Sequence, residues 1–179
     1  MKYVLKKLLI LLTVLLLLGA CSGILKESND SSDSEITVDQ DVTLNDLSDT
    51  NHFMEGALEH IFIGEINRHG DAVGFHYDRF PGKKGRIISD TKTKADEHGV
   101  YEAKVKVDDT EKTSNGGKSS FFPENFTPQD VVDTINKAYE NRTHLNGNTY
   151  EGLSDEGIVV HMYLDESDHI ISAFPLYGE

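Results

Sequence analysis

A sharp change in composition near residue 51 limits where this chain can fold. Leu8 to Leu18 is an almost unbroken run of leucine, isoleucine and valine behind three lysines. Residues 22–50 then hold eight acidic residues against one lysine, a composition that buries too little apolar surface to offset the ordering of the chain. We therefore predict a signal peptide at 1–20, an acidic flexible linker at 21–51 and one folded domain at 52–179.

The signal-peptide segment ends in Leu-Gly-Ala-Cys at residues 18–21, which resembles a bacterial lipobox. The resemblance implies cleavage before Cys21, lipidation of its sulfur, and an exported protein anchored to the bacterial cell membrane. Later release of the domain stays open, and an ordinary signal peptide beside an incidental cysteine is the alternative. Because Cys21 is the only cysteine, no internal disulfide can form, and packing must stabilise the exported domain.

The acidic charge of the mature chain counts against one class of protein. Removing residues 1–20 takes away three lysines and no acidic residue, so the formal net charge changes from −14 to −17. Phosphate contacts dominate nucleic-acid affinity, so such a surface repels bulk nucleic acid. The charge therefore counts against a duplex-coating protein, whereas it does not exclude an enzyme with a small local basic site.

The domain shows helical and strand periodicities in turn. Residues 53–63 have helical apolar spacing, and residues 100–107 alternate as a half-buried strand. Thr127 and Pro128 are typical of a helix start, and this helix is expected to end near Asn141. Residues 80–99 and 108–120 are predicted to be loops.

The C-terminal segment has the pattern of a β-hairpin. Residues 158–164 form the first predicted strand, residues 165–168 the turn, and residues 169–177 the second strand. A two-residue period places Ile170, Ser172, Phe174 and Leu176 on one face. Ser172 and Phe174 are therefore expected to project side by side.

Three histidines, His60, His69 and His76, lie within 17 residues. Histidine exchanges protons near neutral pH, so two of them brought together by a short chain reversal can act as one acid and one base. The alternatives are histidines with a purely structural role and a zinc site. The spacing matches no metal signature, and the only cysteine is distant in the sequence, at position 21.

Four segments, in this order, together resemble the bacterial form of the EndoU endoribonucleases. They are HIFIGEINRHGDAVGFHY at 60–77, GKSSFFP at 117–123, TPQDVVDTINKAY at 127–139 and IISAFPLY at 170–177. The resemblance implies an α+β fold with antiparallel β-sheets and a few packing helices.

The resemblance also implies an activity. It is cleavage of single-stranded RNA beside uridine by the 2′-hydroxyl group, which leaves a 2′,3′-cyclic phosphate. By position, His60 and His76 are the catalytic histidine pair and Lys118 is the catalytic lysine; we take His76 as the base and His60 as the acid. No cofactor is required, no metal ligand is assigned, and stimulation by Mn²⁺ stays open.

The resemblance further implies residues that bind the substrate. Ser172 matches the Ser or Thr that meets the base, and the family often has a tyrosine two residues later. Here that position is Phe174, which can stack on a pyrimidine but offers no hydroxyl. Tyr177 is the alternative source of a hydroxyl, although its period places it on the other face. The replacement of the family's tyrosine by Phe174 is expected to affect base selectivity more than cleavage.

Bacterial members of the family include toxin domains of secreted proteins. A toxin role, an immunity protein as partner and a monomeric state are therefore expectations. The competing hypothesis is a non-catalytic cell-surface binding lipoprotein with a nuclease-derived fold. Two observations motivate this hypothesis: the net charge of −17, and the phenylalanine at position 174 where the family often has a tyrosine.

Overall fold

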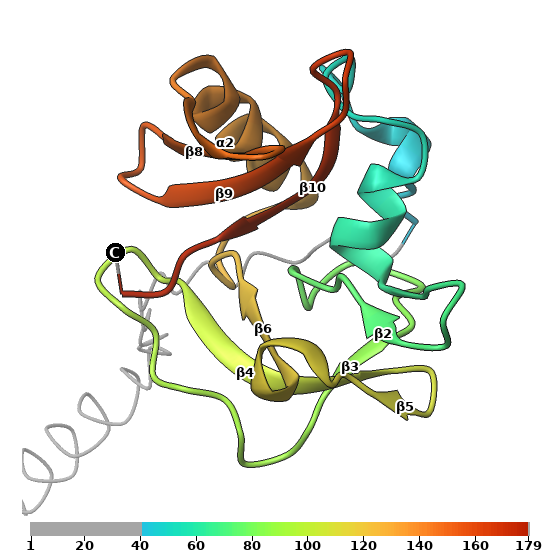
Figure 1. The fold of residues 1–179 in the computed structure, drawn as a ribbon. Helices are drawn as coiled ribbons and strands as arrows, with labels where there is room; N and C mark the ends of the chain where they lie inside the picture. The colour runs from blue at the N-terminus through green and yellow to red at the C-terminus, as the bar shows by residue number, and fades with distance from the viewer. Residues whose placement is uncertain (1–40, 179) are drawn as a thin grey trace, which may run out of the picture. The chain divides into compact units, whose positions relative to one another are not determined.

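The computed structural model describes residues 41–178, which are coloured in Figure 1. The predicted signal peptide, Cys21 and the linker up to residue 40 lie outside the described residues. Within 41–178, no helix combines the length and the apolar character needed to cross a membrane.

The described residues form an α+β fold with antiparallel sheets, as predicted. The strands are short apart from β4, and their bounds are β1 Glu65–Ile66, β2 Ala72–Val73, β3 Gly85–Ile87, β4 Tyr101–Val107, β5 Thr110–Glu111, β6 Lys118–Phe121, β7 Thr143–Asn146, β8 Thr149–Leu153, β9 Val159–Leu164 and β10 Ile170–Pro175. The helical segments are η1 Leu44–Asp46, η2 Glu59–Ile63, η3 Ser114–Gly117 and α2 Pro128–Glu140.

Two sheets carry most of the structure. In the first, β4 pairs with β3, β5 and β6, and in the second the strand order is β10-β9-β8-β7. β1 and β2 make a separate hairpin between His60 and His76. Figure 1 shows β10 at the edge of the second sheet that lies nearest β6, so the two sheets meet along β10 and β6.

Helix α2 covers one face of the second sheet (Figure 1). The hydroxyl of Thr127 accepts a hydrogen bond from the Asp130 backbone N–H, and the Asp130 carboxylate accepts one from the Thr127 N–H. This capping box and Pro128 start the helix where the sequence predicted. Val131 and Ile135 are fully buried against the core side of β8 and β9.

β4 confirms the predicted alternation. Tyr101, Ala103, Val105 and Val107 are buried, whereas Lys104 is exposed. The buried side of this strand builds a small second core in which the Tyr101 and Phe121 rings stack at 5.0 Å. This core holds β6, and with it Lys118, in register with β4.

The predicted linker boundary is wrong, because the residues from 41 to 51 belong to the domain. Val42, Leu44 and Leu47 pack against the main core. The Ser48 N–H donates to the Gln129 side chain, which donates back to the Ser48 carbonyl. The acidic composition hid this segment, since three apolar side chains at short spacing suffice to dock it.

Two further predictions need correction. A register shift between Ile170 and Ser172 turns Ile170 into the core, so Ile170 does not share the face of Ser172 and Phe174. The segments predicted as loops contain β3, β5 and η3. These elements are short and polar, so they show no apolar periodicity in the sequence. Pairing with β4 is what orders β3 and β5.

Candidate active site

His60 lies in a turn of π-helix. The helix predicted at 53–63 is confirmed only in its second half. There Ala57 and Leu58 begin a helical segment that continues as η2. Single π-turns are rare and occur often at functional sites. Here the wider turn leaves the carbonyls of His60 and Ile61 free to pair with another segment of the chain.

Those two carbonyls fix the second histidine. The Phe75 N–H donates to the His60 carbonyl at 2.9 Å, and the His76 N–H donates to the Ile61 carbonyl at 2.7 Å. Gly74 makes this approach possible: its φ is +73°, and a Cβ there would lie 2.1 Å from the His60 carbonyl oxygen. The glycine in the Val-Gly-Phe-His run is therefore a requirement for bringing the histidines together.

His76 is buried, and its ring is oriented by one hydrogen bond. Its Nδ1 lies 2.8 Å from the Ser120 carbonyl oxygen. A carbonyl only accepts, so Nδ1 carries the proton and Nε2 keeps its lone pair. Burial, and then the positive charge of Lys112 and the nearby His60, lower the pKa of His76 well below 6.5. At neutral pH His76 is an uncharged base.

His60 has a different environment from that of His76. Its Nδ1 donates to the Glu65 carboxylate at 2.9 Å, and 19% of its side chain is exposed. The ring centroids of His60 and His76 are 6.3 Å apart. When protonated, His60 forms an ion pair with Glu65 through Nδ1 and keeps an Nε2–H to donate. The two rings are thus suited to opposite tasks.

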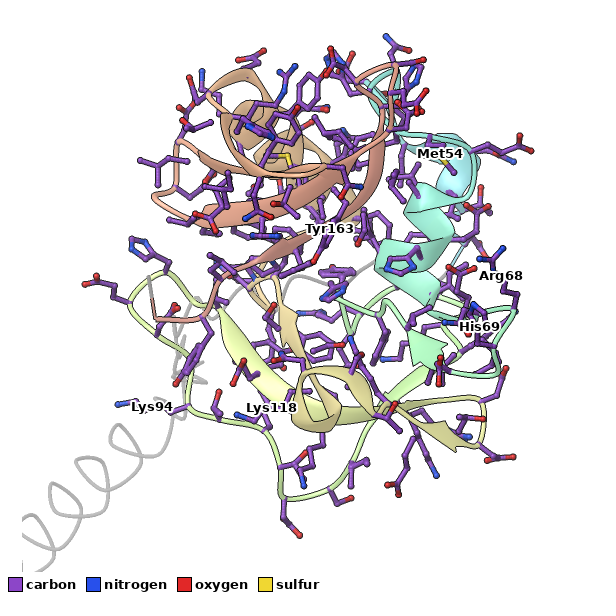
Figure 2. All side chains as sticks on the ribbon, viewed as in Figure 1. Met54, Arg68, His69, Lys94, Lys118 and Tyr163 are labelled. Carbon is purple, nitrogen blue, oxygen red and sulfur yellow. The ribbon has the colours of Figure 1, made fainter. Side chains whose placement is uncertain are left out.

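The histidines line a cleft of about 890 Å³ where the two sheets meet. All six residues that the sequence proposed for catalysis and substrate binding line this same cleft: His60, His76, Lys118, Ser172, Phe174 and Tyr177. His69 does not; Figure 2 shows it at the far side of the β1–β2 hairpin. The roles of the six cleft residues remain predictions, but the fold places their side chains within reach of one substrate.

Lys118 begins β6 and forms an ion pair with Glu102 of β4 at 2.8 Å. This hydrogen bond and the carboxylate charge raise the pKa of Lys118, so the lysine is charged at neutral pH. Its side chain is 43% exposed, which leaves it accessible to an incoming phosphate (Figure 2 labels it).

Lys112 is a second lysine of the cleft, and sequence reasoning missed it. Its ammonium donates to the Ser119 hydroxyl at 2.9 Å, and that hydroxyl donates to the Gly74 carbonyl. Burial lowers the pKa of Lys112 to about 8. The polar composition around residues 108–117 gave no sign that one lysine would turn inward.

His161 and Tyr163 of β9 also line the cleft and were not predicted. A signal was present, because residues that pair directly across two antiparallel strands place their side chains on the same face of the sheet. The observed register pairs Ser172 with Tyr163 and Phe174 with His161. The bulge between Ile170 and Ser172 shifts the pairing by one residue, and nothing in the sequence indicated it, so this register could not be predicted.

No group of three or more His, Cys, Asp or Glu side chains within residues 41–178 is arranged to hold a metal ion. The zinc site considered as an alternative for the histidines therefore has no ligand set in this part of the chain.

The described residues form an α+β domain that gathers two histidines and two lysines in one cleft, side chains that can exchange protons and carry positive charge. The family model described as bacterial EndoU nuclease matches residues 55–177, and the chain belongs to this family. A protein named "Toxin" from Bacillus cereus is 47% identical over 132 residues, which cover 74% of this chain and 24% of the relative. The chain thus spans about a quarter of that relative's length. No solved structure matches.

Replacing Gly74 by alanine tests the backbone approach that joins the histidines. Gly74→Ala forces the His60 carbonyl away, and a misplacement of about 1 Å costs on the order of 10²-fold in rate. Gly70→Ala is the matched control, because Gly70 also has a positive φ, +84°, but a Cβ there meets nothing within 4 Å. We expect nuclease activity to fall at least about 100-fold only in Gly74→Ala. Equal activities in the two folded variants would contradict this role.

Proposed function

We propose that this protein is an exported, lipid-anchored endoribonuclease that cleaves single-stranded RNA at uridines. The observation that supports it most strongly is the histidine pair, in which His76 is neutral with a free Nε2 and His60 is bonded to a carboxylate. RNA carries its own nucleophile, so a base and an acid at these positions can carry out the proton transfers of RNA cleavage.

The proposed reaction is transphosphorylation. Nε2 of His76 removes the proton of the ribose 2′-hydroxyl, and the 2′-oxygen forms a bond to the adjacent phosphorus. The bond from phosphorus to the 5′-oxygen breaks, and protonated His60 gives its Nε2 proton to that oxygen. The products are a 2′,3′-cyclic phosphate and a free 5′-hydroxyl, and the histidines exchange protonation states.

The lysines supply the positive charge that the reaction needs. Negative charge grows on the non-bridging phosphate oxygens as the new bond forms, and a positioned cation stabilises it. We assign this role to Lys118. Lys112 adds a second positive charge at the same cleft, where Glu102 is paired with Lys118. No cofactor enters this scheme, and Mn²⁺ is proposed only as a stimulator.

The three residues that the resemblance implies for substrate binding, Ser172, Phe174 and Tyr177, line the cleft beside the histidines. The Ser172 hydroxyl is proposed to meet the uracil base. Single-stranded RNA is the expected substrate, because its bases are free to enter a cleft of this kind.

Export and a toxic role extend the proposal. A lipid on Cys21 would hold the protein at the membrane, with or without later release of the domain. The name of the Bacillus cereus relative supports a toxin function for this family member. A producing cell then needs an immunity protein that blocks the cleft. We propose a monomer as the active form.

Cleavage of a short uridine-containing RNA by the purified chain without residues 1–20 tests the activity. We expect products ending in a 2′,3′-cyclic phosphate, with the matching DNA left intact because it lacks the 2′-hydroxyl. His60→Ala and His76→Ala should each lower the rate about 10²- to 10⁴-fold, the usual contribution of proton transfer. Lys118→Ala should also lower the rate strongly.

His69→Ala is the matched control for the histidine variants, since His69 is exposed on the hairpin between them and lies outside the cleft. It should retain activity. Loss of activity in His69→Ala with activity kept in His60→Ala would show that the pair has been assigned incorrectly. Absence of cleavage at every pH from 5 to 8, with or without Mn²⁺, would refute the function and favour a non-catalytic binding lipoprotein.

The pH–rate profile should be bell-shaped, with its maximum between roughly pH 5.5 and 7.5. The lowered pKa of His76 keeps this base neutral until the pH is well below 6.5. The rate is therefore expected to fall on the acidic side only at pH values well below 6.5. The alkaline decline follows because the acid must be protonated, and Lys112 loses its charge near pH 8. A rate that rises steadily to pH 10 would instead indicate a metal-bound hydroxide.

A further inference from the structure

Phe174 has little free surface for a nucleobase. Its ring lies 5.1 Å from the His76 ring and 5.2 Å from the His161 ring, with interplanar angles of 21° and 25°. His161 reaches it from the neighbouring strand β9, whereas His76 reaches it across the open edge of β10. Phe174 therefore lies between two nearly parallel imidazoles, and a base can stack on it only by displacing one of them.

Tyr177 does not replace the missing hydroxyl. Its phenol donates to the Lys94 carbonyl at 3.0 Å and ties the C-terminal segment to the loop before β4. Donating this hydroxyl to a nucleobase would break that contact. The cleft therefore needs another aromatic side chain if it is to hold and read a pyrimidine.

Tyr163 has the required properties. It pairs with Ser172 in the β9–β10 register and lines the same cleft, so the two side chains stand next to each other on one sheet face. Figure 2 labels Tyr163 where this face turns toward the first sheet. Its ring meets His161 edge-on, at 65°, and the Phe174 ring at an angle of 41° and 6.3 Å. Within residues 41–178, its hydroxyl makes no hydrogen bond.

We propose that Tyr163 and Ser172 together form the subsite that binds and reads the uracil base. This inference rests on the proposed function and deepens it. The Tyr163 ring supplies the stacking surface, and its hydroxyl donates to a carbonyl oxygen of uracil beside the Ser172 hydroxyl. Phe174 then acts as a positioning residue that keeps the His76 ring in place, and the tyrosine lost at position 174 is supplied from the neighbouring strand.

The test uses DNA oligonucleotides that carry a single ribonucleotide, either uridine or cytidine, so that each has one cleavable bond. The kcat and KM values are measured for the wild-type chain, Tyr163→Phe and Tyr163→Ala. Tyr163→Phe keeps the ring, so its uridine-over-cytidine ratio of kcat/KM should fall about tenfold while cleavage persists. Tyr163→Ala also loses stacking, so its KM for uridine should rise about tenfold or more with kcat little changed.

Tyr150→Phe is the matched control. Tyr150 lies on β8 of the same sheet but outside the cleft, so its ratio should equal that of the wild type. Thermal unfolding of each variant checks that it folds.

The outcomes separate this inference from the proposed function. If the wild type cleaves neither substrate, the function itself fails. If the wild type prefers uridine and Tyr163→Phe keeps that preference, the subsite is assigned incorrectly. A wild type that cleaves both substrates equally, or a Tyr163→Ala variant that loses kcat with KM unchanged, would likewise overturn the inference while the nuclease assignment stands.

Discussion

Two backbone hydrogen bonds hold the site together. The carbonyls of His60 and Ile61 accept hydrogen bonds from the N–H groups of Phe75 and His76, and this pairing joins the π-turn to the segment after β2 that carries the second histidine. Backbone bonds of this kind are insensitive to side-chain identity, but they require the chains to approach closely. Gly74 permits that approach, because a side chain there would collide with the His60 carbonyl.

The difference between the two histidines follows from what surrounds this junction. His76 points into the protein, where the Ser120 carbonyl holds its Nδ1–H and burial disfavours its charged form. His60 remains partly exposed and bonds to Glu65. The second sheet completes the arrangement, since Phe174 at its edge rests against the His76 ring. Local structure thus gives two chemically identical side chains different tasks.

Part of this fold could be predicted from the sequence because it is encoded locally. The Thr127 cap, the alternation from Tyr101 to Val107 and the C-terminal hairpin each depend on residues a few positions apart. The six site residues came from a resemblance to a family, and no local pattern would have joined His60 to Lys118. They meet only because β4, β6 and the hairpin are assembled around them.

What could not be predicted depends on register and on distant contacts. The bulge after Ile170 changes the face of that residue, and the pairing of Ser172 with Tyr163 follows from the same register. Lys112 turns inward because its ammonium donates a hydrogen bond to the hydroxyl of Ser119, a buried residue of β6. Residues 41–51 dock on α2 through Gln129, although their composition is that of a linker. Local periodicity carries no information about such contacts.

The protonation state of His76 is the central claim, and ¹⁵N NMR of the imidazoles during a pH titration tests it most directly. His76→Gln identifies the resonances. The structure predicts that His76 is the neutral tautomer with the proton on Nδ1 at pH 7, and that it titrates with a midpoint well below 6.5. A His76 that carries its proton on Nε2 at neutral pH, or that titrates at or above 6.5, would contradict its role as the base.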